Sequence, residues 1–120
     1  MRRSLWLIAG AAVLLSLAVP AMAHDKAYKT RVTIEHPSEP NYEGDVISRS
    51  RACVRKRDVQ FWLDNPGSTP DQLVDTVEAD REGHWQFAFI GPQYYAKVKR
   101  IVKAPGRHRH VCKRDRSPTV

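Results

Sequence analysis

The sequence predicts an all-β fold: a single antiparallel β-sandwich of six to seven short strands, preceded by a signal peptide. Two observations carry this prediction. Apolar and polar residues alternate with a period of two in several short segments, which is typical of strands that bury one face. Clusters of Gly, Pro, Asn, Asp and Ser separate these segments at intervals of roughly ten residues, a spacing typical of sandwiches and barrels.

The first 23 residues predict a signal peptide rather than a part of the fold. A short basic start precedes an apolar run that ends in Pro20 and a small-x-small tripeptide at 21–23, which fits a signal-peptidase site. An uncleaved anchor is the alternative, but the run is short for crossing a ~30 Å hydrocarbon core. We expect cleavage after Ala23. Residues 24–120 would then form one domain of a secreted, periplasmic or cell-envelope protein without a transmembrane segment.

The N-terminal part of this domain is expected to contain two strands. Residues 28–36 alternate, and the following share the apolar face: Tyr28, Thr30, Val32, Ile34 and His36. The prolines of 37–41 then break the chain, so 24–41 is read as a strand followed by a linker. The next strand is expected over 42–48.

The later strands are predicted in the same way. Alternation is clearest at 58–63, and the turn formers of 64–70 indicate a loop. Further strands are expected at 84–90 and 94–99, and Pro118 favours a short edge strand at the end. The aromatic residues expected in the core are Phe61, Trp85, Phe87, Phe89 and Tyr94. Trp62 and Tyr95 fall on the opposite faces of their strands, where they either contact a carbohydrate or protein or pack under a loop.

Residues 69–83 have two interpretations. Thr69, Pro70 and Gln72 fit the start of a helix, and Gly83 fits its end. Three β-branched residues within 74–77 lower the helix propensity, however, and the apolar stripe stops early. We therefore favour a strand that runs into a turn at 80–83, after which the aromatic strand folds back to pair with it as a hairpin. The helix remains the alternative.

The pattern of the second half resembles transthyretin-like or carboxypeptidase-regulatory-like domains, which are Ig-like β-sandwiches of secreted proteins. The turn residues Asp80 and Gly83 with the aromatics that follow them fit an Asp-x-x-Gly-x-aromatic-x-aromatic motif, and 94–98 fits a Tyr-x-Ala-x-Val strand. The match covers roughly residues 42–120 and leaves 24–41 and the basic tail after Pro105 unmatched. The resemblance implies an accessory, adhesive or binding module rather than a catalyst, and it does not name a ligand.

Two cysteines, Cys53 and Cys112, remain in the exported domain. An oxidising compartment and an even count favour a disulfide between them, and the alternatives are two free thiols or half of a metal site. Closing a loop of about 60 residues would stabilise so small a domain by roughly 4 kcal/mol in the chain-entropy model.

Positive charge concentrates around the two cysteines. The chain carries 20 Lys and Arg against 13 Asp and Glu, and within 49–57 and 97–116 the one acidic residue is Asp115. A disulfide would bring these two segments to one end of the sandwich. We therefore predict an anion-binding patch that comprises Arg49, Arg51, Arg55, Lys56, Arg57, Arg107, Arg109, Lys113, Arg114 and Arg116. Its partner would be an anionic polysaccharide, lipid headgroups or another protein, and the alternative is a solvated basic surface without a ligand.

Three other functions receive less support. Nucleic acid is an unlikely partner on this sequence, because few aromatic residues are interleaved with the cations. An exported copper-binding protein is the second hypothesis: His24 would become the N-terminus, and His108 and His110 would complete a site of nitrogen ligands, although the arginines around them would repel a cation. No cofactor is otherwise expected. We also expect no enzyme, since Ser48 and Ser50 have no evident base in the sequence and no carboxylates are paired.

Overall fold

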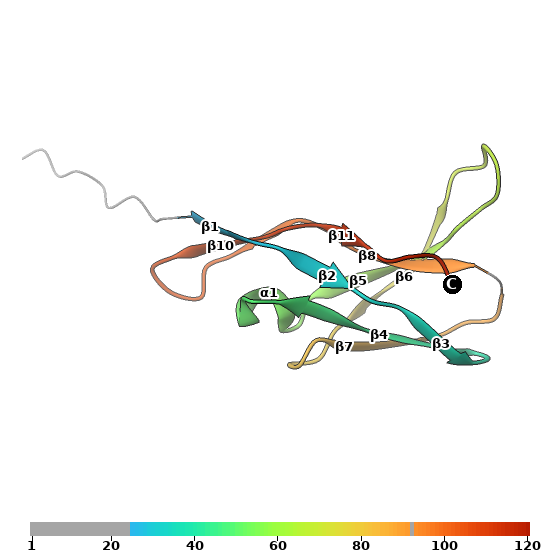
Figure 1. The fold of residues 1–120 in the computed structure, drawn as a ribbon, viewed down its shortest axis with the longest axis horizontal. Helices are drawn as coiled ribbons and strands as arrows, with labels where there is room; N and C mark the ends of the chain where they lie inside the picture. The colour runs from blue at the N-terminus through green and yellow to red at the C-terminus, as the bar shows by residue number, and fades with distance from the viewer. Residues whose placement is uncertain (1–24, 92) are drawn as a thin grey trace, which may run out of the picture.

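A computed structural model of the chain describes residues 25–91 and 93–120, so the predicted signal peptide and His24 lie outside the described residues. The fold is an all-β sandwich, as the alternation predicts (Figure 1). Its strands are β1 (Asp25–Tyr28), β2 (Thr30–Val32), β3 (Glu35–Ser38), β4 (Asn41–Ser48), β5 (Asp58–Leu63), β6 (Gln72–Glu78), β7 (His84–Ala88), β8 (Tyr94–Val98), β9 (Ile101–Lys103), β10 (Arg109–Cys112) and β11 (Asp115–Arg116). A single helical turn, α1 (Arg51–Val54), joins β4 to β5.

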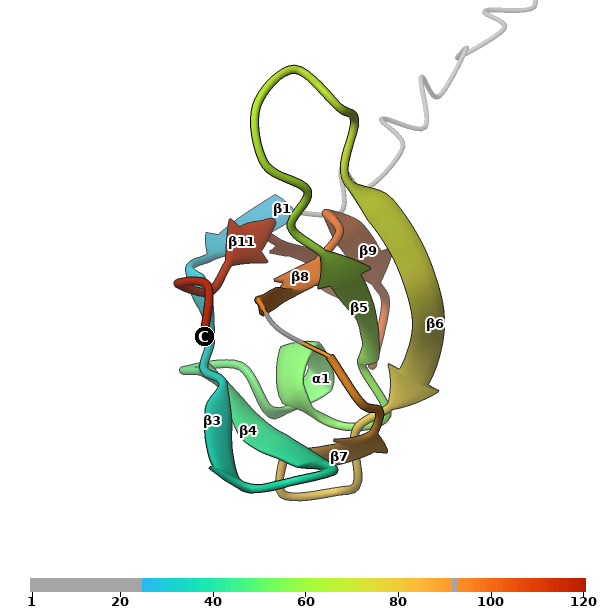
Figure 2. The same cartoon turned by 90° about the vertical axis from the view of Figure 1, so that its right-hand side faces the viewer.

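One layer of the sandwich is built around β4. The consecutive strands β2 and β3 follow one another along one edge of β4, and β7 pairs with β4 as well, all antiparallel. The stretch expected to be a linker therefore contributes β3 and its turn to this layer. The other layer has the strand order β11-β8-β5-β6 and is antiparallel throughout. Figure 2 looks along the sandwich and shows β3, β4 and β7 on one side and β11, β8, β5 and β6 on the other.

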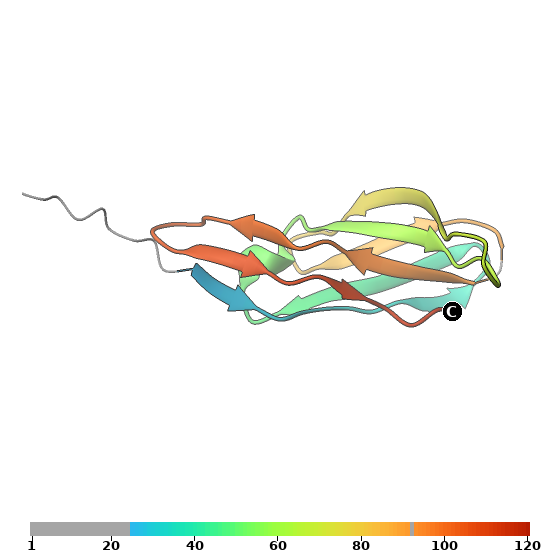
Figure 3. The ribbon, with the colours of Figure 1, turned by 90° about the horizontal axis from the view of Figure 1, so that it is seen from above.

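A three-stranded ribbon extends the second layer past the end of the sandwich (Figure 3). It consists of β1, β10 and β9, in that order, where β9 continues the line of β8 and β10 leads into β11. We call it the ribbon extension. The pair β1–β10 is parallel, in contrast to the antiparallel pairing expected throughout. The first strand is therefore shared: β1 belongs to the ribbon, whereas β2 crosses to the layer of β4.

The core lies between the layers and follows from the alternation. Phe61 of β5 is its centre, with ring centroids 4.5 Å from Phe87, 4.7 Å from Tyr94 and 5.1 Å from Tyr42. Trp85 is 2% exposed. The remaining buried core residues are Val32, Ile34, Val46, Val59, Ala79, Ala96 and Val98. Four of the five predicted core aromatics thus pack inside, three of them fully buried. Phe89 is the exception, because β7 ends at Ala88 and leaves it 42% exposed.

Residues 72–78 form a strand rather than a helix, but the hairpin predicted after it is wrong. β6 pairs with β5, whereas β7 crosses to the opposite layer and pairs with β4. The Asp80 carboxylate accepts hydrogen bonds from the N–H groups of Glu82 and His84, both at 2.9 Å, which fixes the turn. The Gly83 carbonyl then accepts the Val46 N–H at 2.8 Å, and this bond begins the pairing with β4. The turn is therefore an arch between the layers.

The layer of β8 ends in β11 on one side and in β6 on the other. The terminal strand β11 is the two-residue edge strand that Pro118 predicts, and β2 lies beside it, with the Val32 N–H donating to the Asp115 carboxylate at 2.8 Å. At the other edge of that layer, in β6, the Asp75 carboxylate accepts the N–H of the next residue, Thr76, at 2.7 Å. In the described residues, no helix is long and apolar enough to cross a membrane.

Candidate anion-binding groove

The predicted disulfide is present. Cys53 of α1 and Cys112 of β10 are bonded, with their Cα atoms 5.4 Å apart, and both residues are 0% exposed. The bond lies where the ribbon extension meets the sandwich and joins the two Lys- and Arg-rich segments. Burial, and next the nearby positive charges of Arg57 and Arg55, lower the pKa of Lys103, as expected where cations of the two segments crowd together.

Arg57 does not belong to the surface patch in which the sequence placed it. Its side chain is buried, with 1% of the residue exposed, beneath the disulfide end. One guanidinium nitrogen donates to Thr30 Oγ1 at 3.3 Å and to the Cys53 carbonyl at 2.9 Å. The other donates to the Lys99 carbonyl at 2.7 Å and to the Lys113 carbonyl at 3.1 Å. Burial lowers the pKa of Arg57, and the side chain acts as an internal tie between four segments.

The other nine cations of the predicted patch are exposed. Arg109 forms an ion pair with Asp25 at 2.9 Å within the ribbon extension. Arg116 lies on the outer face of the β8 layer, with its guanidinium 3.7 Å from the centroid of the Tyr95 ring. Arg116 and Arg114 line one small concavity, and Arg49 contributes to another. Of the ten predicted residues, Arg57 is therefore not on the surface, and the grouping of the other nine into one patch stays a prediction. A smaller group of cations can form a more local site.

Such a site exists where β1 and β4 diverge. Pairing between β2 and β4 ends at Thr30 and Ser48. Beyond this point β1 pairs with β10 in the ribbon extension, whereas the segment that follows β4 turns into α1. An open groove of about 760 Å³ remains between them, a volume within the usual range of ligand sites. Its lining, which we call the basic groove, comprises Ala27, Tyr28, Lys29, Arg31, Ile47, Ser48 and Arg49.

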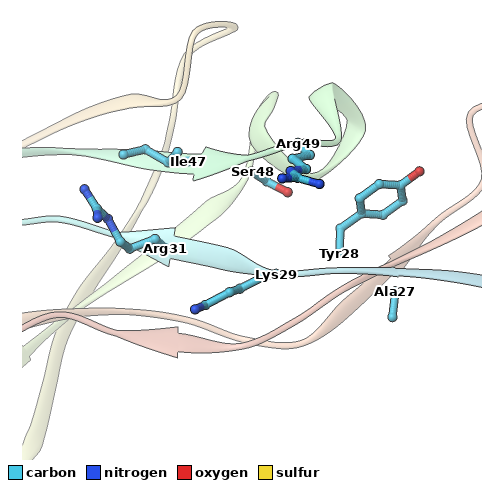
Figure 4. Close-up of a pocket in the computed structure, with 7 residues that line it drawn as sticks. All are labelled: Ala27, Tyr28, Lys29, Arg31, Ile47, Ser48 and Arg49. Atoms are coloured by element: carbon cyan, nitrogen blue, oxygen red, sulfur yellow. The ribbon is translucent and has the colours of Figure 1, made fainter.

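Three exposed cations line the basic groove (Figure 4). Lys29 and Arg31 project from the strand that carries β1 and β2, and Arg49 comes from the end of β4. Within residues 25–91 and 93–120, none of the three forms an ion pair with a carboxylate. Of these three, only Arg49 was in the predicted patch. Lys29 and Arg31 lie on the exposed face of the first strand, and their proximity to Arg49 depends on the β2–β4 register, which the sequence does not reveal.

Tyr28, which lines the basic groove, is held in place by neighbouring side chains. The ring of Tyr28 packs against the ring of His110, with centroids 4.8 Å apart. His110 Nδ1 in turn lies 2.7 Å from the hydroxyl of Ser50. No base for Ser50 is evident in the sequence, and the structure supplies His110 as its partner. Ser50 is only 4% exposed, however, so its oxygen is closed to a substrate and the pair serves to fix the imidazole.

One histidine of the copper hypothesis, His24, lies outside the described residues. His108 is exposed in the loop before β10, and His110 is half-buried with one ring nitrogen engaged by Ser50. Among the residues that the structure describes, no three His, Cys, Asp or Glu side chains are grouped so as to hold a metal ion.

The two outward-facing aromatics have different environments. Tyr95 is 4% exposed: its hydroxyl donates to the Asp71 carboxylate at 2.8 Å, and Arg116 covers its ring. It therefore packs under a loop, as one of the two interpretations expected. Trp62 is half-buried, lies parallel to Tyr95 at 6.3 Å, and has the Lys97 ammonium 5.6 Å from the centroid of its ring.

Comparison with known proteins gives no family for this chain. No protein-family model matches it, and no curated protein or solved structure shows significant similarity. The resemblance to transthyretin-like and carboxypeptidase-regulatory-like domains consequently stays a prediction, and the function has to be argued from the groove.

Proposed function

We propose that this chain is an exported, non-catalytic binding module whose basic groove holds an anionic component of the cell envelope. The observation that carries the proposal is the grouping of Lys29, Arg31 and Arg49 around one open concavity, without carboxylate partners in the described chain. Like charges held together destabilise a fold unless solvent or a ligand screens them, so the groove favours anions. A protein partner with an acidic surface is the competing occupant.

Export and the lack of catalysis are parts of the same proposal. The disulfide supports an oxidising compartment, in agreement with the signal-like sequence of 1–23. The burial of Ser50, which has the one serine–histidine contact in the described residues, supports a binding role rather than hydrolysis. Rigid strands on both sides of the groove also suit a binding site that is largely formed before the ligand arrives.

The test is a binding measurement with heparin as the polyanionic probe at several salt concentrations. A groove variant carries Lys29→Ala, Arg31→Ala and Arg49→Ala. A control variant removes the same net charge elsewhere through Arg81→Ala, Lys97→Ala and Arg114→Ala. We expect the groove variant to lose at least tenfold more affinity than the control, and the slope of log K against log salt to fall by on the order of one per lost contact.

Equal losses in the two variants would contradict the proposal, because binding would then follow net charge and not the groove. Binding that persists at high salt in both variants would contradict it as well, since contacts between exposed charges are screened over about 10 Å at 0.1 M salt.

A further inference from the structure

The basic groove contains more than cations. Tyr28 presents an aromatic ring, Ile47 is 46% exposed and offers an aliphatic surface, and Ser48 adds a hydroxyl. A site for a bare inorganic anion has no use for an aromatic ring and an aliphatic side chain beside its cations. The mixture is instead suited to a ligand that carries both negative charge and apolar ring faces.

The cations are also spread along the groove. Lys29 and Arg31 are two residues apart on one strand, which places their Cα atoms about 6.7 Å apart. Arg49 lies two residues beyond Ile47, the register partner of Arg31, on the neighbouring strand. Lys29 lies between β1 and β2 and Arg49 directly follows β4, and the side chains of all three cations contribute to the lining of the groove. A ligand with several anionic groups, each a few ångströms from the next, neutralises this arrangement better than one small anion does.

Tyr28 is held in a fixed orientation, which makes it suitable as a stacking surface. Its ring is half-buried and packed on His110, and the Ser50 hydroxyl holds that imidazole in place. Less side-chain freedom is then lost when a ligand binds, so more of the contact energy remains as affinity. Aromatic rings fixed in this way pack well against the apolar faces of pyranose rings.

From these three features we infer that the occupant is an acidic polysaccharide: a chain of sugar rings with carboxylate, sulfate or phosphate groups. The cations pair with the acidic groups, one sugar ring lies on Tyr28, and Ile47 offers an apolar contact to another sugar of the same chain (Figure 4). This inference rests on the proposed function, since it names the ligand class of the same groove. The concave shape argues against a flat lipid surface, which would contact the rims of the groove and leave its walls unused.

The experiment distinguishes binding that depends on charge alone from binding that also depends on sugar rings. The full exported chain is titrated with a heparin oligosaccharide, with inorganic polyphosphate of matched charge number, and with vesicles containing anionic phospholipid. Three proteins are compared: the unmodified chain, Tyr28→Leu and Tyr28→Phe. We expect Tyr28→Leu to weaken oligosaccharide binding about 5–10-fold, the range of one aromatic contact, and to leave polyphosphate binding unchanged. Tyr28→Phe should bind the oligosaccharide within about twofold of the unmodified chain.

Three other outcomes would overturn either the polysaccharide inference or the proposed function. If Tyr28→Leu binds both soluble probes as tightly as the unmodified chain does, the polysaccharide inference is overturned, although the groove would still be an anion site. If vesicles bind more tightly than the oligosaccharide, a membrane surface replaces the polysaccharide. If Lys29→Ala, Arg31→Ala and Arg49→Ala together affect no probe, the proposed function itself is overturned. A far-UV circular dichroism spectrum of Tyr28→Leu that matches that of the unmodified chain shows that this variant is folded.

Discussion

The buried guanidinium of Arg57 provides a quantitative prediction about what holds the disulfide end together. The side chain donates four hydrogen bonds to Thr30 and to the carbonyls of Cys53, Lys99 and Lys113, and so links the first strand, α1 and both sides of the ribbon extension. The substitution Arg57→Met keeps the unbranched stem of the side chain and removes the guanidinium group with every donor. All four acceptors then lose their partner at once.

The expected loss of stability follows from the burial of these acceptors. The bonds to Thr30 and Cys53 are fully buried, and those to Lys99 and Lys113 are partly buried. At ~2 kcal/mol for each buried acceptor and ~1 for each partly buried one, the orphaned groups cost about 6 kcal/mol. Removing a desolvated charge offsets on the order of 3 kcal/mol of this. We therefore expect a net decrease of about 3 kcal/mol in the free energy of unfolding.

Urea unfolding under non-reducing conditions measures this difference. The matched control is Arg55→Met, the same substitution two residues away on an exposed side chain, which should change stability by less than about 0.5 kcal/mol. Arg57→Lys should be at least as unstable as Arg57→Met, because it keeps the buried charge while one ammonium cannot reach all four acceptors. If Arg57→Met unfolds within about 0.5 kcal/mol of the unmodified chain, with an unchanged m-value, the network does not stabilise the fold.

Three further predictions concern other parts of the fold. Replacing Cys53 and Cys112 with alanine together should cost about 4 kcal/mol, since the disulfide closes a loop of sequence separation 59, and an unchanged unfolding midpoint would refute this. Gly83→Ala should cost about 2–4 kcal/mol in thermal unfolding, because φ is +90° and an added Cβ would collide with Val46 and Val54. The control Gly67→Ala, at φ +69° in open space, should cost only ~1 kcal/mol. Equal costs for the two substitutions would argue against the collision. Burial, and next the hydrogen bond to the Asp71 carboxylate, raise the pKa of Tyr95 to about 12. The contribution of this group to stability is therefore complete below pH ~10 and lost as pH rises towards ~12, and NMR titration of the Tyr95 ring should show a lower pKa in Asp71→Asn.

The strands themselves were readable from the sequence, because alternation and burial have the same cause. Val59 and Phe61 face the core since every second residue of a strand points to the same side, and the polar residues between them need water or a partner. The disulfide was readable as well, from the parity of the cysteines and the expected compartment. These features depend on short-range pattern or on composition.

What the sequence could not show is which strand pairs with which. The residues at 80–83 are typical of a tight turn. Such a turn can connect two strands of one layer as a hairpin or two strands of opposite layers as an arch. Packing decides here: Phe87 reaches Phe61 with 4.5 Å between ring centroids because β7 lies across the core from β5. The parallel pairing of β1 with β10 was hidden for the same reason, since it joins segments far apart in the chain.

In the candidate site, too, the sequence predicts the local features but not the pairing of the strands. The sequence marked Lys29 and Arg31 as exposed and Arg49 as part of a basic cluster, but only the register of β2 against β4 groups them. Arg57 was misplaced because its charge looks like that of its neighbours. Its burial depends on four acceptors from other segments of the chain, and no local sequence pattern predicts them.

The central claim, that anions bind in the basic groove, is tested most directly by NMR. Amide chemical shifts of the isotope-labelled protein are followed during titration with a heparin oligosaccharide. We predict that the largest saturable changes fall on residues 27–31 and 47–49, and that they disappear when Lys29, Arg31 and Arg49 are alanine. Changes centred on Arg114 and Arg116, or scattered over all exposed cations without saturation, would contradict the claim.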